Sequence, residues 1–292
     1  YSHLLYDEHP YGRILEWETV KDLSSDDLKN FHEHYYKPNN VMMAISGDFK
    51  TKDMIKKISN AFKNWEKEEV EFGDIPEVRY DFHPGVYLID KDINQSNLRI
   101  GKLGIKQGNP DEYAITIMNF ILGGGSFTSR LTSRVRSDEG LAYSVGSGFS
   151  TDNRDYGTFT AYCQTKNESA HKAVRLILEE IEKMRSEPVD PDELQNAKDT
   201  YINGYIFNFA SKSQVVNRLM ELEYENYPRD YLKNYLDNIR AVTAEDVRRA
   251  ASEYLDTGKM TVMVIGDTEK FDGDMSDFGM VHNIEIKEPA LD

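Results

Sequence analysis

The stretch SSDDLKNFHEHYYKPNNVMMAISGD at residues 24–48 recurs as TAEDVRRAASEYLDTGKMTVMVIGD at residues 243–267, without a gap. Copies this far apart indicate a duplicated domain, because the units of a solenoid recur every ~20–50 residues. A unit as long as the offset predicts a second copy over 76–292 and only the end of a first copy over 1–75. We therefore expect the chain to belong to a longer polypeptide, in which more than about a hundred residues precede Tyr1.

The spacing of apolar residues predicts an α+β fold with a mixed, largely antiparallel sheet covered by helices. Helical spacing is found at 24–36 and 51–62, and a long helix contains Val174, Ile177 and Ile181. We expect further helices to begin at Asn109 and at Asp190. Strands are predicted at 41–45, 86–89, 97–103, 142–149, 156–164 and 260–265.

Composition limits the classes of function. The 292 residues contain 35 Lys and Arg against 51 Asp and Glu, a net charge of −16. Such a balance argues against nucleic acid as a partner and favours cationic or unstructured peptides. No apolar run reaches the ~18 residues of a membrane helix. The compartment, bacterial cytoplasm or periplasm, stays open.

Few residues stand in a pattern of known chemistry. Cys163 is the single cysteine and falls on the apolar side of a predicted strand, which favours a place in the core. None of the seven histidines stands in HExxH or HxxEH, so the sequence predicts no metal ligand in this chain. His32-Glu33-His34 comes closest, but residues two apart on a helix point to different sides.

Gly123, Gly124 and Gly125 lack the Gly-Lys-Ser/Thr of a phosphate loop. They could end a helix, or they could let a bound backbone approach closely. They begin two motifs, LGGGSFTSRL at 122–131 and VRSDEGLAYSV at 135–145. HPYG at 9–12, YYKPNN at 35–40 and NQS at 94–96 accompany them in the chain.

Together these motifs resemble the C-terminal portion of the pitrilysin/insulinase family of zinc peptidases, the inverzincins, in its short bacterial and mitochondrial-processing branch. The resemblance implies duplicated α+β domains. It also implies that HxxEH and a further Glu lie upstream of His9, so that zinc would belong to the parent protein and not to this chain. Arg136 and Tyr143, seven residues apart, match the Arg and Tyr that this family places opposite the zinc.

The resemblance assigns Arg136 and Tyr143 catalytic roles, since a guanidinium can hold a substrate carbonyl or carboxylate and a phenol can donate to a developing oxyanion. It implies capture of an extended peptide at a sheet edge, and Gly123, Gly124 and Gly125 as substrate-binding residues. Three functions stay open: the C-terminal region of a zinc endopeptidase, the non-catalytic subunit of a dimer with a zinc-bearing homologue, and a peptide-binding module.

Overall fold

The computed structural model describes residues 1–286, which form two compact units. Unit 1 contains residues 1–13, residues 77–203 and the described residues from 233 onward. Unit 2 contains residues 14–76 and 204–232. The assignment of residues 1–75 and 76–292 to two copies of a domain stays a prediction.

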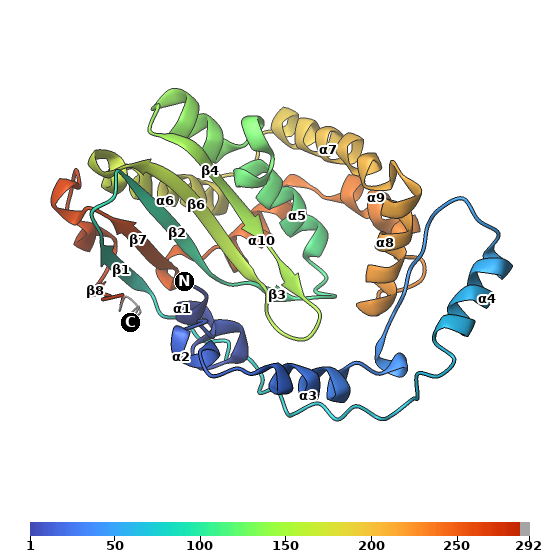
Figure 1. The fold of residues 1–292 in the computed structure, drawn as a ribbon. Coiled ribbons are helices and arrows are strands. Elements are labelled where there is room, and N and C mark those ends of the chain that lie inside the picture. The colour runs from blue at the N-terminus through green and yellow to red at the C-terminus, as the bar shows by residue number, and fades with distance from the viewer. Residues whose placement is uncertain (287–292) are drawn as a thin grey trace. The chain divides into compact units, whose positions relative to one another are not determined.

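A six-stranded sheet in the spatial order β4-β6-β2-β7-β1-β8 forms the centre of unit 1 (Figure 1). Its strands are β1 (Gly85–Asp90), β2 (Gln95–Leu103), β4 (Ala142–Phe149), β6 (Thr158–Lys166), β7 (Thr261–Gly266) and β8 (Val281–Asn283). The pairs β4/β6, β6/β2 and β2/β7 are antiparallel, and β1 is parallel to both β7 and β8. This confirms the mixed, largely antiparallel sheet that the sequence predicts. Two short strands were not predicted, β3 (Ile105–Lys106) and β5 (Thr151–Asp152), which pair in parallel.

One face of the sheet packs against helices. Figure 1 shows α6 (Ala170–Ser186) and α10 (Ala244–Tyr254) behind the strands. Alternate residues of β6 point into this core: Phe159, Ala161 and Cys163 are almost inaccessible to solvent. Burial raises the pKa of the Cys163 thiol to about 12, so this cysteine is a core residue, as its place in the alternation predicts. The other helices of unit 1 are α1 (Ser2–Tyr6) and α5 (Glu112–Asn119), together with most of α7 (Pro191–Tyr205) and α9 (Tyr231–Ala241).

A capping box and an ion pair stabilise α10. Thr243 and Asp246 form a capping box at its start, with Thr243 Oγ1 accepting from the Asp246 backbone N–H. Farther along, Arg249 donates two hydrogen bonds, of 2.9 and 2.6 Å, to the carboxylate of Asp111, the N-cap residue of α5. The sequence predicts this N-cap at Asn109, two residues too early. The Asn109 side chain instead accepts a hydrogen bond from the Asp111 N–H, in a turn that precedes the helix.

Unit 2 is mainly helical. It contains α2 (Trp17–Val20), α3 (Ser25–Tyr35), α4 (Thr51–Ala61) and α8 (Lys212–Tyr224). The predicted helices at 24–36 and 51–62 are confirmed by α3 and α4. In the described part of the chain, residues 1–286, no helix is both long enough and apolar enough to cross a bilayer.

The two copies of the repeat share a helix but not a strand. Ser24 and Asp27 form the same capping box on α3 that Thr243 and Asp246 form on α10. The strand predicted at 41–45 is absent, however, whereas its counterpart β7 lies between β2 and β1. A strand needs a partner for its backbone groups, and among residues 1–286 no strand pairs with 41–45. The prediction was therefore wrong for the structure described here.

The matched caps provide a test of how much packing contributes to each helix. We expect Thr243→Ala to lower the free energy of unfolding by about 1 kcal/mol. Ser24→Ala should have a smaller effect on the main unfolding transition, because α3 has no buried residue whereas α10 buries Val247, Ala250 and Ala251. Urea unfolding followed by far-ultraviolet circular dichroism measures both. Equal effects would show that α3 is packed as firmly as α10.

Acid should weaken the attachment of α10. The hydrogen bond from Arg249 lowers the pKa of Asp111, and the hydrogen bond from Thr243 lowers that of Asp246. Carboxylates with a lowered native pKa stabilise the fold above their unfolded pKa of about 3.9, and this contribution is lost as the pH falls through the lower native value. We expect Asp111→Asn to reduce stability at pH 7 by about 1 kcal/mol.

The same variant should lose less stability than the wild type between pH 5 and pH 2, because it has one such carboxylate fewer. Urea midpoints measured across this pH range test the expectation. Parallel pH curves for the two proteins would contradict it.

Candidate functional site

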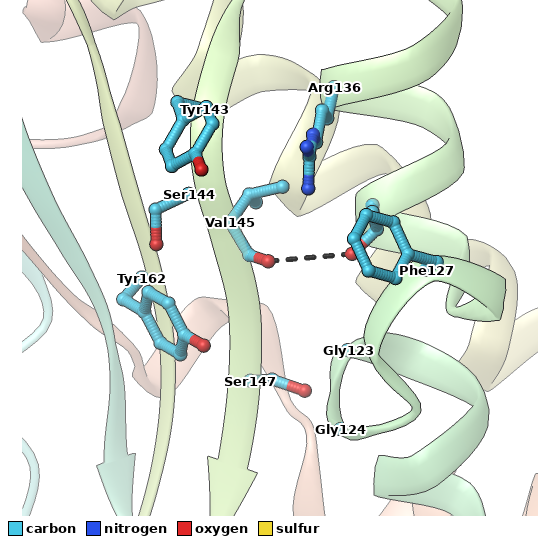
Figure 2. Close-up of a pocket in the computed structure, with 10 residues that line it drawn as sticks. Gly123, Gly124, Phe127, Arg136, Tyr143, Ser144, Val145, Ser147 and Tyr162 are labelled. Carbon is cyan, nitrogen blue, oxygen red and sulfur yellow. Dashed lines mark hydrogen bonds between the residues drawn. The ribbon is translucent and has the colours of Figure 1, made fainter.

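A cavity of about 280 Å³ lies beside the edge strand β4 (Figure 2). It is bounded by the π-helix η3 (Phe120–Gly124), the 3-10 turn η4 (Ser126–Thr128), the π-helix η5 (Thr132–Asp138) and the strands β4 and β6. Its lining residues are Gly123, Gly124, Phe127, Thr132, Arg136, Tyr143, Ser144, Val145, Ser147 and Tyr162. Two π-helices at one cavity are unusual, and this form of helix occurs frequently at functional sites.

Arg136 projects from η5 into this cavity (Figure 2). Its Cζ lies 4.8 Å from the ring centroid of Phe127 and 5.1 Å from that of Tyr143, so two aromatic rings hold the guanidinium by cation–π contact. Among residues 1–286 the structure shows no carboxylate paired with it. The guanidinium is thus positioned by rings, which leave its five N–H donors for a ligand.

A turn between η5 and β4 sets the distance between Arg136 and Tyr143. Gly140 has φ +66°, in the left-handed region that favours glycine, and ends the helical segment. Glu139 beside it accepts a 2.6 Å hydrogen bond from Lys172 of α6, which lowers the pKa of Glu139. The turn is therefore fixed to the helical layer behind the sheet.

A β-bulge places Tyr143. Ala142 is opposite Thr165 and Ser144 is opposite Gln164, so Tyr143 is an extra residue with no partner on β6. A bulge redirects a side chain out of the regular alternation. The Tyr143 side chain is 84% exposed, and its hydroxyl and the Arg136 guanidinium face the same space (Figure 2). The structure thus brings together the two residues that the sequence predicts to be catalytic.

The three glycines have different surroundings. Gly123 is buried against β4, and a Cβ atom there would lie 2.4 Å from the backbone nitrogen of Ser147. Gly124 is exposed and lines the cavity, whereas Gly125 is not among the lining residues. At Gly123 the close approach is to the chain's own strand. The substrate-binding role of all three glycines stays a prediction.

Side chains already occupy two backbone carbonyls on the outer edge of β4. The backbone carbonyl of Val145 accepts a 3.5 Å hydrogen bond from Thr132, and that of Ser147 accepts one of 3.4 Å from Asn119. Ser147 also donates from its hydroxyl to the Asn119 side chain at 2.8 Å. A peptide that paired along this edge would have to displace these groups. Capture of a peptide at a sheet edge stays a prediction. The occupied carbonyls argue against pairing of a peptide with β4 at Val145 and Ser147.

Sequence reasoning missed Tyr162 of β6, which forms the wall of the cavity opposite the helices. Its hydroxyl lies over Gly146, where a Cβ atom would be only 2.7 Å away. On its other side, the Arg99 Cζ of β2 lies 5.3 Å from the centroid of its ring. The period-2 pattern of β6 placed Tyr162 on the face opposite the core, but the register with β2 and β4 is needed to find these neighbours.

The described residues do not provide a set of zinc ligands. Among residues 1–286 no group of three or more His, Cys, Asp or Glu side chains lies close enough together to bind a metal. His32 and His34, the nearest approach in the sequence, instead contact the rings of Tyr36 and Tyr35. Arg136 is the one charged residue among those that line the described cavity.

Substitution of the glycines distinguishes packing from ligand binding. We expect Gly123→Ala to lower the free energy of unfolding by about 1–3 kcal/mol, because the added methyl group meets the backbone of β4. Gly124→Ala is the comparison and should cost less, since its Cβ would lie 2.8 Å from the Asn119 side-chain amide and 3.2 Å from the Asn119 carbonyl oxygen. Urea unfolding measures both, and equal stability of the two variants would contradict the packing role of Gly123.

Comparisons with known proteins agree with this architecture. The family model described as "Peptidase M16 inactive domain" matches residues 22–201. The chain is 27% identical over 255 residues to "Uncharacterized zinc protease YmxG" of Bacillus subtilis, covering 86% of this chain and 61% of that protein. It is 24% identical over 262 residues to "Non-peptidase homolog YmxG" of Helicobacter pylori, covering 87% of this chain and 58% of that protein.

Among solved structures, a peptidase M16 inactive domain from Pseudomonas fluorescens superposes with a TM-score of 0.80 at 27% identity. The match covers 91% of this chain and 63% of that one. The chain thus spans about six tenths of the length of these relatives. The fold and the family model together confirm the resemblance seen in the sequence: the chain belongs to the peptidase M16 inactive domain family.

Proposed function

We propose that this chain is the substrate-binding region of a zinc endopeptidase that acts on peptides or unfolded polypeptides. The observation that carries the proposal is the convergence of Arg136 and Tyr143 on one open cavity. Neither side chain has a hydrogen-bonded partner among the described residues, and both reach the cavity through special backbone features, a π-helix and a bulge. Relatives such as the protein named an uncharacterized zinc protease in Bacillus subtilis support the reaction class.

The two side chains would have different roles in peptide-bond cleavage: Arg136 would bind the substrate and Tyr143 would stabilise the developing negative charge. The Arg136 fork can hold a peptide carbonyl or carboxylate with two parallel N–H donors. The Tyr143 hydroxyl can donate to the carbonyl oxygen as that oxygen gains negative charge. The backbone brings both groups to the cavity before substrate binds, because η5 carries Arg136 and the bulge of β4 carries Tyr143. Zinc would be held by residues outside those described here.

A second function, a non-catalytic subunit that acts with a zinc-bearing homologue, has its own support. The relative from Helicobacter pylori is called a non-peptidase homologue, and residues 1–286 show no cluster of metal ligands. Such a subunit would keep the cavity and lend Arg136 and Tyr143 to a partner. A peptide-binding module without any hydrolytic role is the third alternative.

Zinc content and peptide cleavage, measured on the full-length gene product beside this chain, separate these functions. Zinc together with chelator-sensitive cleavage of a fluorogenic peptide in the full-length protein alone would support the endopeptidase. Zinc-free full-length protein that cleaves only after a zinc-bearing homologue is added would support the subunit. Peptide binding without cleavage in every combination would leave the binding module.

We expect Arg136→Ala and Tyr143→Phe each to lower kcat/KM of the active form by about 10²–10³-fold, the effect of removing one preorganised donor to a developing oxyanion. Ser137→Ala is the control, because Ser137 lies on the same π-helix, is exposed and does not line the cavity. Steady-state kinetics on a fluorogenic peptide measure all three. Full activity of both site variants would remove these residues from the mechanism.

A further inference from the structure

The face of the sheet opposite α6 and α10 carries residues in register that start at the cavity. Part of this face is covered, because Leu5 of α1 packs against Leu103 of β2 and Met263 of β7 is buried. The strand registers align Gly146 of β4 with Tyr162 of β6, and Tyr162 with Arg99 of β2. The alignment continues through Met263 of β7 to Tyr87 of β1. Because residues in register lie on the same face, Tyr162 and Arg99 are the exposed residues that lead from the Arg136 cavity onto the sheet.

Tyr162 links the cavity to Arg99. Its ring lies under the Arg99 guanidinium, at 5.3 Å from Cζ to the centroid, and its hydroxyl lies over Gly146 at the cavity wall. Arg99 is exposed, and the structure shows no carboxylate paired with it among residues 1–286. A guanidinium stacked on a ring keeps its N–H edge available for a planar anion. Arg99 therefore has the same arrangement as Arg136.

The strands of the sheet carry a charge opposite in sign to that of the whole protein. Of 51 Asp and Glu residues in the sequence, only Asp90 lies in the six strands of the sheet. Its carboxylate accepts two hydrogen bonds from Thr268, and the period of β1 places it on the face opposite Tyr87. Arg99 and Lys166 are the charged strand residues on the face opposite α6 and α10. A net charge of −16 therefore does not describe the surface beside the cavity.

We propose that Arg99 is a specificity-determining residue that binds an acidic side chain of the peptide substrate. The inference rests on the function proposed above and adds a substrate class to it: extended peptides with Asp or Glu near the bond held by Arg136 and Tyr143. The peptide leaves the cavity over the Tyr162 ring, and its carboxylate meets the Arg99 fork. Net protein charge alone favours cationic peptides, whereas this face favours acidic ones.

Sheet geometry gives the expected spacing. Arg99 lies two strands away from β4, which is about 10 Å, and an extended peptide rises about 3.3 Å per residue. The acidic residue should therefore stand about three positions from the residue held in the cavity. A Glu placed elsewhere in the same peptide should contribute much less, since a single guanidinium has limited reach.

A glutamate scan tests this inference. A fluorescein-labelled nonapeptide of Ala and Ser, with one Glu moved along it, is titrated against the full-length protein in chelator and low salt, and fluorescence anisotropy gives Kd. Matched peptides carry Gln or Lys at the same position. We expect one Glu position to bind about tenfold more tightly than Gln, the size of a charge-assisted hydrogen bond, with Lys weaker than Gln.

Three variants identify the residue responsible. Arg99→Gln should abolish the preference for Glu, and Arg99→Lys should retain part of it, because charge stays while the two-pronged fork is lost. Lys166→Gln removes a positive charge from the same face and should leave the preference unchanged. Unfolding midpoints equal to the wild type would show that the variants are folded.

The outcomes separate this inference from the proposed function. Weaker binding of every peptide in Arg136→Ala, together with an Arg99→Gln variant that still prefers Glu, would overturn the role of Arg99 while leaving the cavity as the peptide site. Equal binding of Glu, Gln and Lys peptides by the wild type would also overturn it. Absence of binding by any peptide would overturn both proposals.

Discussion

The burial of one face of the six-stranded sheet under α6 and α10 is the constraint on which the rest of unit 1 depends. Each strand must keep its apolar residues toward these helices, and a shift of one residue would turn them to the other side. Residues such as Phe159 and Ile100, fully inaccessible to solvent, therefore fix the register of their strands. The residues between them are fixed at the same time on the opposite face, where the functional groups stand.

Helices such as α3 and α4 could be predicted from local signals. The caps at Ser24 and Thr243 are readable because a hydroxyl residue three positions before a carboxylate acts within one turn. The strand at 41–45 could not be judged in this way. Its sequence resembles that of β7, yet a strand exists only through its neighbours, and those of β7 are supplied by β1 and β2.

The candidate site was predictable in part. Arg136 and Tyr143 were found through motifs, and their convergence depends on a bulge at Tyr143 that no alternation of apolar residues reveals. Tyr162 and Arg99 carry no motif at all, so only the register of three strands brings them to the cavity wall. The glycine run shows a further limit: the sequence leaves open whether these residues end a helix or admit a bound backbone, and at Gly123 the structure shows the backbone of β4 in close approach.

The missing strand also affects how this chain, taken by itself, behaves in concentrated solution. Val41, Met42, Met43 and Ile45 are all more than a third exposed and form an uncharged run with β-forming residues. Unpaired backbone next to such side chains is a template on which a second molecule can add its own strand. Mutual repulsion between strongly negative molecules opposes this encounter. Acidification or high salt weakens that repulsion, so colloidal stability depends on charges far from the segment that would aggregate.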